Sequence, residues 1–308
     1  MTYKKIKTVF FGTHNFAETI LEGIANSPLF DVQLVITQPD RPVGRKQELQ
    51  VPPAKLLAQK YNIPVEQPAS LKNFKFQISN FKLSIVAQYG LLIPPHILNA
   101  PQHGTINVHT SLLPKYRGAS PIQSALINGE TETGVTIMKM DVGLDTGPIL
   151  LQKSLIIDPD DTYTDLDKKL AVLGVQGLEE AIPQYIEGKL NPVPQDDSKA
   201  TTCKQLSRDD GRIDWNKTSQ EIYNLYRGLT PWPGVWTMWQ DKRLKLLNIK
   251  PVKDSISAGQ VTVKNDILLI GTSNASIQVL ELQLEGKPKM DAKIFLNGYK
   301  NIVSSILK

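Results

Sequence analysis

Near its start the chain reads Lys7-Thr-Val-Phe-Phe-Gly-Thr-His-Asn-Phe16. The apolar run 7–11 predicts a strand, and the residues after it predict a tight turn. Asn15 is predicted to cap a helix, with Glu18 completing a capping box. Apolar residues then recur at a spacing of four, as on one face of a helix: Phe16, Ile20 and Ile24.

The same alternation of strand and helix continues over the first two thirds of the chain. Further strands are predicted at 32–37, 64–66 and 83–87, and helices near 54–61, from Leu71 and over 165–187. Residues 38–53 carry too many prolines and charges for regular structure and predict a long exposed loop. We therefore expect an α/β fold with a Rossmann-like, doubly wound, mainly parallel sheet.

The last third has a different pattern. Residues 188–203 hold two prolines among polar residues, which is a linker composition. After a helix near 219–228, short strands are predicted at 235–240, 244–249, 259–263, 267–270 and 276–284. Five short strands in succession predict a C-terminal OB-like β-barrel. The predicted domains are 1–187 and 204–308, joined by a linker over 188–203.

The composition is that of a soluble globular protein. Of 308 residues, 41% are hydrophobic and 21% are charged, which argues against a disordered or fibrous chain. No apolar run approaches the roughly 18 to 20 residues of a membrane helix, so we expect no membrane association. The single cysteine, Cys203, can form no internal disulfide and no Cys-x-x-Cys zinc site. A reducing, cytoplasmic compartment is expected.

Positive charge is concentrated in the C-terminal third. The net charge is +5, and residues 204–308 hold 16 basic and 10 acidic side chains. This asymmetry favours a polyanionic partner such as RNA, although a solvated basic surface is the alternative. The best phosphate-binding candidates are Lys242, Arg243, Lys245 and Lys250. Trp232 and Trp236 could stack on bases or pack within the protein.

Several common catalytic motifs are absent. The first turn holds one glycine, Gly12, where a dinucleotide-binding fingerprint needs three. The phosphate-binding loop, the His-Glu-x-x-His zinc motif and the Gly-x-Ser-x-Gly elbow are missing as well. A nucleophilic role for Ser111 therefore has little support.

Asn107 and His109 lie two residues apart at the end of an apolar run. On a strand they point to one face, at the edge where open α/β sheets place active sites. An asparagine amide can donate to a developing oxyanion and a histidine can move a proton near neutral pH, which suits acyl transfer to an amine. Alternatively, Asn107 makes turn hydrogen bonds and His109 is a satisfied, partly buried imidazole.

A second polar loop follows the predicted strand that begins at Gly134. It holds Asp141, Asp145 and several glycines. Asp145 could orient His109 or accept a proton relayed from the attacking amine. Both carboxylates could instead serve turn chemistry, since the loop lacks the ligand pattern of a calcium-binding EF-hand.

Long motifs in this order resemble the folate-dependent formyltransferases, in particular the branch that formylates methionyl-tRNA. The match covers nearly the whole chain, at 11–13, 37–45, 86–94, 107–109, 111–123, 133–147, 212–215 and 231–236. It implies metal-independent transfer of the formyl group of 10-formyltetrahydrofolate to the α-amino group of methionine on charged initiator tRNA. It also implies no DNA partner and a monomer.

The resemblance also assigns roles to residues. Asn107 would stabilise the oxyanion, His109 would deprotonate the amine or assist the oxyanion, and Asp145 would hold His109; how His109 and Asp145 divide the proton transfer stays open. The implied folate-binding residues are Gln88, Tyr89, Gly90, Leu91, Leu92, Ser111, Leu112, Leu113, Pro114, Asp141, Val142, Gly143 and Leu144. The implied tRNA-binding residues are Arg41, Arg45, Lys46, Lys242, Arg243 and Lys245.

Two departures from the family pattern stand out. Thr110 replaces the usual glycine after the histidine, and the loop 44–48 is less basic than usual. A formyltransferase acting on an amino sugar or a glycine-derived nucleotide is one alternative, and a non-catalytic RNA-binding protein is another. The basic C-terminal region and the loop 37–45 favour tRNA, while the intact trio of Asn107, His109 and Asp145 favours catalysis.

Overall fold

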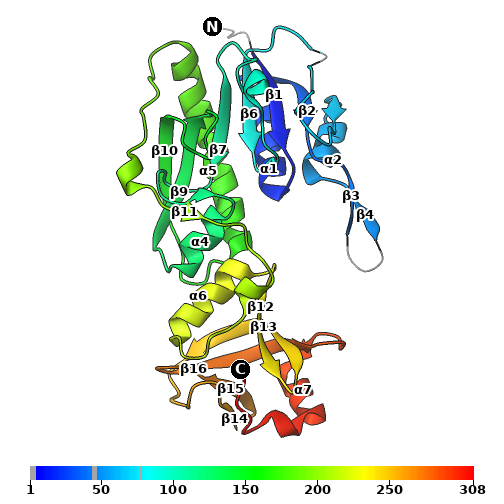
Figure 1. Ribbon diagram of the computed structural model, residues 1–308, viewed down its shortest axis with the longest axis vertical. Helices are drawn as coiled ribbons and strands as arrows, with labels where there is room; N and C mark the ends of the chain where they lie inside the picture. The colour runs from blue at the N-terminus through cyan, green and yellow to red at the C-terminus, as the bar shows by residue number, and fades with distance from the viewer. Residues whose placement is uncertain (1–4, 44–46, 77) are drawn as a thin grey trace. The chain divides into compact units, whose positions relative to one another are not determined.

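The computed structural model describes residues 5–43, 47–76 and 78–308, which form two compact units (Figure 1). The first unit holds the chain up to Gly118, Glu132–Ile156 and Asp167–Thr202. The second holds Ala119–Thr131, Ile157–Leu166 and Cys203–Lys308. The chain therefore passes between the units several times, and the predicted domain limits at 188–203 stay a prediction.

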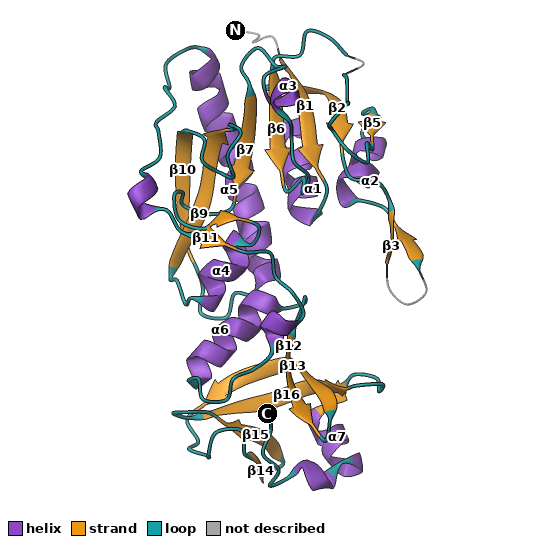
Figure 2. Cartoon of the chain, viewed as in Figure 1, coloured by secondary structure: helices purple, strands orange, loops and turns teal. Residues whose placement is uncertain are grey.

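The first unit is built on a seven-stranded sheet in the order β10-β9-β7-β6-β1-β2-β5 (Figure 2). Five neighbouring strands are parallel: β1 (Ile6–Gly12), β2 (Phe30–Ile36), β5 (Val65–Glu66), β6 (Leu83–Ala87) and β7 (Thr105–His109). At one edge, β9 (Glu132–Lys139) runs antiparallel to β7, and β10 (Ile149–Ile156) runs antiparallel to β9. The predicted mainly parallel sheet is confirmed.

Three helices of this unit begin close to their predicted positions: α1 (Asn15–Asn26), α2 (Pro53–Lys60) and α5 (Tyr163–Ile186), the last of which enters the unit at Asp167. The short helix α3 (Pro95–Leu98) was not predicted. Phe16, Ile20 and Ile24 are fully buried, as the spacing predicts. The predicted cap is wrong, because Asn15 is already helical and His14 before it makes no side-chain capping bond.

Two further local predictions are wrong. No helix starts at Leu71; the described residues there form turns and irregular backbone. The rings of Phe74 and Phe76 pack edge to face with centroids 5.4 Å apart, and residues two apart cannot share a helix face. The predicted irregular loop 38–53 contains a short hairpin of β3 (Arg41–Val43) and β4 (Glu48–Gln50).

The second unit is an antiparallel β domain with helices. Its sheet contains β12 (Val235–Trp239), β13 (Lys242–Val252), β14 (Val261–Lys264), β15 (Ile267–Gly271), β16 (Ser276–Leu284) and β17 (Met290–Asp291). The helices are α4 (Pro121–Ile127), α6 (Ser219–Leu229) and α7 (Ala292–Gly298), and Thr218 and Glu221 form a capping box on α6. A separate two-stranded sheet consists of the two-residue strands β8 (Arg117–Gly118) and β11 (Thr202–Cys203).

The antiparallel sheet does not close on itself through its strand ladders. The path ends at β12 and β14. The prediction of a separate C-terminal β domain is confirmed, and its OB-like barrel stays a prediction. The last residues bond to both end strands: Val261 N donates to Ser305 O and Met238 N donates to Lys308 O, each at 2.9 Å. Among the described helices, none is both long and apolar enough to cross a membrane.

Candidate active site

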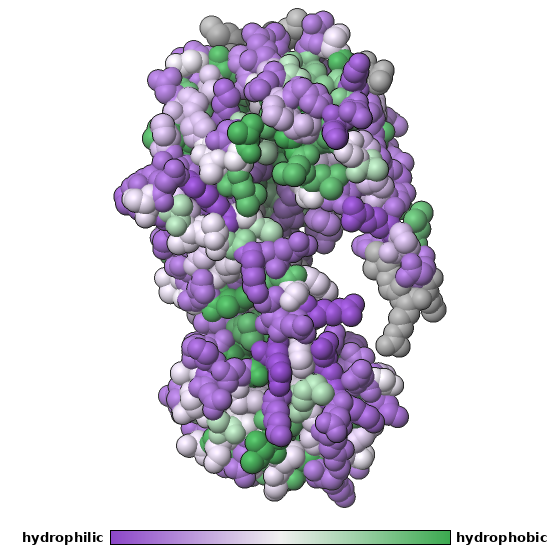
Figure 3. All heavy atoms as spheres, viewed as in Figure 1, coloured by the Kyte–Doolittle hydropathy of each residue, from purple (hydrophilic) through white to green (hydrophobic). Residues whose placement is uncertain are grey.

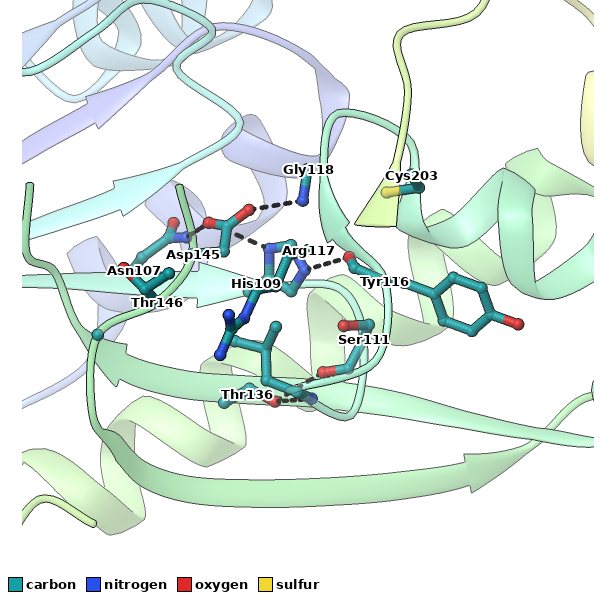
Figure 4. Close-up of polar contacts among 12 residues, drawn as sticks. Asn107, His109, Ser111, Tyr116, Arg117, Gly118, Thr136, Asp145, Thr146 and Cys203 are labelled. Atoms are coloured by element: carbon teal, nitrogen blue, oxygen red, sulfur yellow. Dashed lines mark hydrogen bonds and ion pairs between the residues drawn. The ribbon is translucent and has the colours of Figure 1, made fainter. Parts of the chain in front are cut away.

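The structure brings the three predicted catalytic side chains together at the carboxyl end of β7 (Figure 4). Asn107 and His109 occupy alternate positions of that strand and are 9% and 6% exposed. Asp145 comes from the loop between β9 and β10, where its backbone adopts φ +54°. All three side chains are thus largely shielded from water, where hydrogen bonds and charges act more strongly than in solvent.

One oxygen of Asp145 faces both partners. Its Oδ1 lies 3.5 Å from the Nδ2 of Asn107 and 3.6 Å from the Nδ1 of His109. The other oxygen, Oδ2, accepts a 2.9 Å hydrogen bond from the backbone N–H of Gly118. The carboxylate is therefore anchored through Oδ2, and Oδ1 is directed at the asparagine and the histidine.

The second ring nitrogen of His109 fixes how the ring is protonated. Nε2 lies 3.0 Å from the carbonyl oxygen of Tyr116, and a carbonyl oxygen can only accept. Nε2 therefore carries a hydrogen, as inferred from this partner. The other ring nitrogen, Nδ1, lies on the side of the Asp145 carboxylate, so a proton exchanged by this ring would be gained or lost at Nδ1.

The residues after β7 form a packed turn. The hydroxyl of Ser111 donates to Lys115 O at 2.6 Å, and Thr136 Oγ1 donates to Ser111 O at 2.6 Å. Leu113 is 3% exposed, and its N–H also donates to Thr136 Oγ1. Since the Ser111 hydroxyl is committed to this turn, it is not positioned as a nucleophile, in agreement with the missing elbow motif.

Asp141 makes the turn hydrogen bonds that its sequence context allowed. Its Oδ1 accepts hydrogen bonds from Gly143 N at 2.9 Å and from Thr146 Oγ1 at 2.8 Å. The side chains between these residues point outward: Val142 is 83% and Leu144 67% exposed. The loop therefore presents apolar side chains to solvent close in sequence to Asp145.

The segment after β6 is anchored by a buried tyrosine. Tyr89 packs edge to face on Phe11, and burial raises the pKa of its hydroxyl to about 12. Its carbonyl oxygen accepts from Thr13 Oγ1 at 3.0 Å and from Gln38 Nε2 at 2.7 Å. Leu92, three residues later, is 93% exposed. The segment 88–92 thus has a fixed base and an apolar, exposed end.

The predicted tRNA-binding residues of the first unit are only partly described. Arg41 is exposed at the start of β3. Arg45 and Lys46 lie outside the described residues.

In the second unit, Lys242, Arg243 and Lys245 all lie on β13. The guanidinium of Arg243 lies 3.9 Å from the ring centroid of Trp236, and Arg212 lies 5.9 Å from it. Trp236 is 6% exposed and its Nε1 donates to Arg208 O. Arginine therefore covers the ring that could have stacked on a base, whereas Trp232 is 57% exposed.

Three contributors to the site were not found from the sequence, one of them the N–H of Gly118 that bonds to Asp145. Tyr116 acts through its backbone carbonyl, for which no side-chain pattern exists. Gln195, in the segment predicted to be a linker, donates from Nε2 to the carbonyl oxygens of Asp145 and Gly147, each at 2.8 Å.

Among the described residues, no group of three or more His, Cys, Asp or Glu side chains is arranged to hold a metal ion.

Comparison with known proteins assigns the chain to a family. The model of formyl transferases matches residues 4–182, and that of the formyl transferase C-terminal domain matches 205–300. The methionyl-tRNA formyltransferases of Caldicellulosiruptor saccharolyticus and Koribacter versatilis are 43% and 44% identical to it, each over 95% of this chain and 96% and 95% of their own. The chain belongs to the methionyl-tRNA formyltransferase family. The resemblance inferred from its motifs is thereby confirmed.

Solved structures share the fold at lower identity. An N-formyltransferase from Helicobacter canadensis, in complex with folinic acid and dTDP-3-aminofucose, aligns with a TM-score of 0.66 at 21% identity over 89% of this chain and 98% of its own. HypX from Aquifex aeolicus, in complex with tetrahydrofolic acid, aligns with a TM-score of 0.67 at 16% identity over 97% of this chain and 48% of its own.

Proposed function

We propose that this chain transfers the formyl group of 10-formyltetrahydrofolate to the α-amino group of methionine on charged initiator tRNA. The observation that carries the proposal is the arrangement of Asn107 and His109 around one oxygen of Asp145, in a member of this family. An amide donor, an imidazole and a carboxylate are the groups that an uncatalysed amine attack on a formyl carbon lacks.

The reaction forms one bond and breaks another. The amine nitrogen bonds to the formyl carbon, the carbonyl oxygen becomes an oxyanion, and the bond from that carbon to the folate nitrogen then breaks. The amide of Asn107 donates to the oxyanion. The proton lost by the amine passes to the pair of His109 Nδ1 and Asp145 Oδ1. The same pair returns a proton to the folate nitrogen as the carbonyl re-forms and that nitrogen leaves.

The proposed folate-binding residues suit a flat ring with an apolar surface. Leu92, Val142 and Leu144 are large apolar side chains left in solvent, and small-molecule sites are lined mainly by side chains of this type. Figure 3 shows hydrophobic side chains gathered on the surface of the first unit. The segments Gln88–Leu92 and Asp141–Leu144 would supply backbone groups to the ring edge, and the turn of Ser111, Leu112, Leu113 and Pro114 would form a packed wall of the same site.

A formylation assay tests the proposal. Purified protein is incubated with 10-formyltetrahydrofolate and with methionyl initiator tRNA, uncharged tRNA or an amino-sugar nucleotide. Formyl-methionyl-tRNA is the expected product. Transfer to the sugar alone would contradict the tRNA assignment, and tRNA binding without any transfer would favour a non-catalytic binder.

We assign the tRNA contacts to the basic side chains of both units. In the first unit these are Arg41, Arg45 and Lys46, and in the second Lys242, Arg243 and Lys245.

The proposal also includes a monomeric enzyme, an OB-like C-terminal barrel and the domain limits 1–187 and 204–308. Deleting residues 204–308 would not test the tRNA contacts cleanly. The deletion removes α6, and α4, which remains, packs against α6 within the second unit.

Arg41→Ala should raise the KM for charged tRNA about 3- to 10-fold and leave kcat nearly unchanged, since a phosphate contact contributes to binding in the ground state and the transition state alike. The salt dependence of tRNA binding should weaken by about one unit of slope. Steady-state kinetics and binding at several salt concentrations measure both quantities. Lys72→Ala, which removes an exposed cation of the same unit, is the control. An unchanged KM and slope would take Arg41 out of the interface.

Arg243→Gln should weaken tRNA binding by a similar factor. Stacking on Trp236 limits the freedom of the guanidinium, so less entropy is lost when it binds a phosphate. The matched control is Lys264→Gln, which removes one cation of the same unit that is paired with Asp254. Equal effects of the two substitutions on the tRNA dissociation constant would show that only net charge matters and would contradict a specific contact.

A further inference from the structure

The segment 188–203 supplies one side chain to the catalytic loop. Nε2 of Gln195 donates to Asp145 O and Gly147 O at 2.8 Å each, while Oε1 accepts from Arg117 Nε at 3.1 Å and Nη2 at 2.8 Å. A side-chain amide has two donor hydrogens and two acceptor lone pairs, so these four bonds use its full capacity. Carbonyls only accept and guanidinium only donates, which permits a single orientation of the amide.

Arg117 is itself held in place. It is 8% exposed, and its Nη2 also pairs with Asp197 Oδ1 at 2.7 Å. It lies between two groups that contact the trio: Tyr116, whose carbonyl accepts from His109, and Gly118, whose N–H donates to Asp145. The same short stretch of chain therefore contacts the histidine, the carboxylate and Gln195.

The loop of Asp145 needs such an anchor. Asp145 adopts φ +54°, a sparsely populated region that aspartate enters more readily than most non-glycine residues, so contacts around the loop select this conformation. The neighbouring Val142 and Leu144 are exposed and give the loop little packing. Two hydrogen bonds from Gln195 to the carbonyls of Asp145 and Gly147 fix the backbone on both sides of Thr146.

We infer that Gln195 is a positioning residue for formyl transfer: oriented by Arg117, it holds the loop backbone so that Oδ1 of Asp145 faces Asn107 and His109. The inference rests on the proposed role of Asp145. It assigns the segment 188–203 a part in the catalytic geometry in addition to that of a connection. Gln195 itself contacts neither Asn107 nor His109, so its effect passes through Asp145.

Gln195→Glu is the test substitution. The carboxylate keeps the size of the side chain and gains an ion pair with Arg117, so the fold should be preserved. It also sets an acceptor against each of the two loop carbonyls. We expect kcat to fall about 10- to 100-fold, because small displacements of a catalytic group are costly, with the KM for tRNA within about threefold of the wild type. Gln184→Glu, the same change at an exposed position of α5, is the matched control and should be neutral.

A double-mutant cycle separates positioning from a general structural role. Asparagine tolerates positive φ, so Asp145→Asn removes the charge with little change in backbone. If Gln195 acts through Asp145, Gln195→Glu should add less than about threefold to the loss caused by Asp145→Asn. Melting temperatures of all four proteins are measured alongside kcat.

Three results would contradict this inference, and they distinguish a failure of the Gln195 role from a failure of the Asp145 role. A Gln195→Glu enzyme with unchanged kcat, while Asp145→Asn is impaired, would remove Gln195 from the mechanism. Additive losses in the cycle, or a lowered melting temperature that accounts for the lost kcat, would show a merely structural role. Normal activity of Asp145→Asn would refute the proposed role of Asp145 itself.

Discussion

His109→Ala should lower kcat for formyl transfer by about 10²- to 10⁴-fold, the range that general acid–base groups contribute. The imidazole Nδ1 faces the Asp145 carboxylate, and Nε2 is committed to the Tyr116 carbonyl. The methyl group of alanine can neither receive the amine proton nor bond to the carbonyl. Single-turnover formylation at saturating folate and tRNA measures the loss directly, without a contribution from product release.

The control for this substitution is His96→Ala, which removes an exposed imidazole of the same unit. The KM for tRNA and the melting temperature of His109→Ala should stay close to those of the wild type, because the ring makes one hydrogen bond to the backbone and is assigned no contact with tRNA. Activity within about tenfold of the wild type would contradict the assigned role.

The parts of the fold that the sequence predicted well are those where one signal dominates. The strand Leu83–Ala87 is apolar except at Ser84, all five positions are buried, and its limits were predicted to the residue. The segment from Leu71 was predicted wrongly because Leu71, Phe74, Ile78 and Phe81 recur at helical spacings of three and four. Phe76 falls outside that pattern, and it packs against Phe81 nearby and against Phe11, far away in sequence.

In the site, too, the residues that carry a periodic signal were predictable, and those placed by loop conformation were not. Asn107 and His109 were predicted to share a face because strand periodicity fixes the direction of alternate side chains. Asp145 could be named from a family motif, but its approach to His109 depends on a left-handed backbone conformation and on the N–H of Gly118. Gln195 was missed because a composition rich in proline and polar residues predicts a connection, and a single glutamine in it carries no periodic signal.

Asn107→Asp should lower kcat by about 10²- to 10³-fold, the usual cost of removing one donor to an oxyanion. The change is nearly isosteric, yet it replaces the Nδ2 donor by an acceptor oxygen. In the wild type Nδ2 lies 3.5 Å from Oδ1 of Asp145, so the new oxygen would face that carboxylate. Two carboxylates at this separation repel each other, which favours protonation of one of them. The enzyme therefore loses its donor and gains a misplaced charge in a site shielded from water.

Asn107→Leu distinguishes these two effects, because leucine removes the donor without adding a charge. We expect both variants to be impaired near neutral pH. As pH falls, the aspartate variant should partly recover relative to the leucine variant, since a protonated carboxyl can again donate a hydrogen bond to the oxyanion. Asn99→Asp, at an exposed position of the same unit, serves as the control. Wild-type activity of Asn107→Leu would mean that the oxyanion is stabilised elsewhere, and parallel pH profiles of the two variants would mean that lost donation alone does not explain the defect.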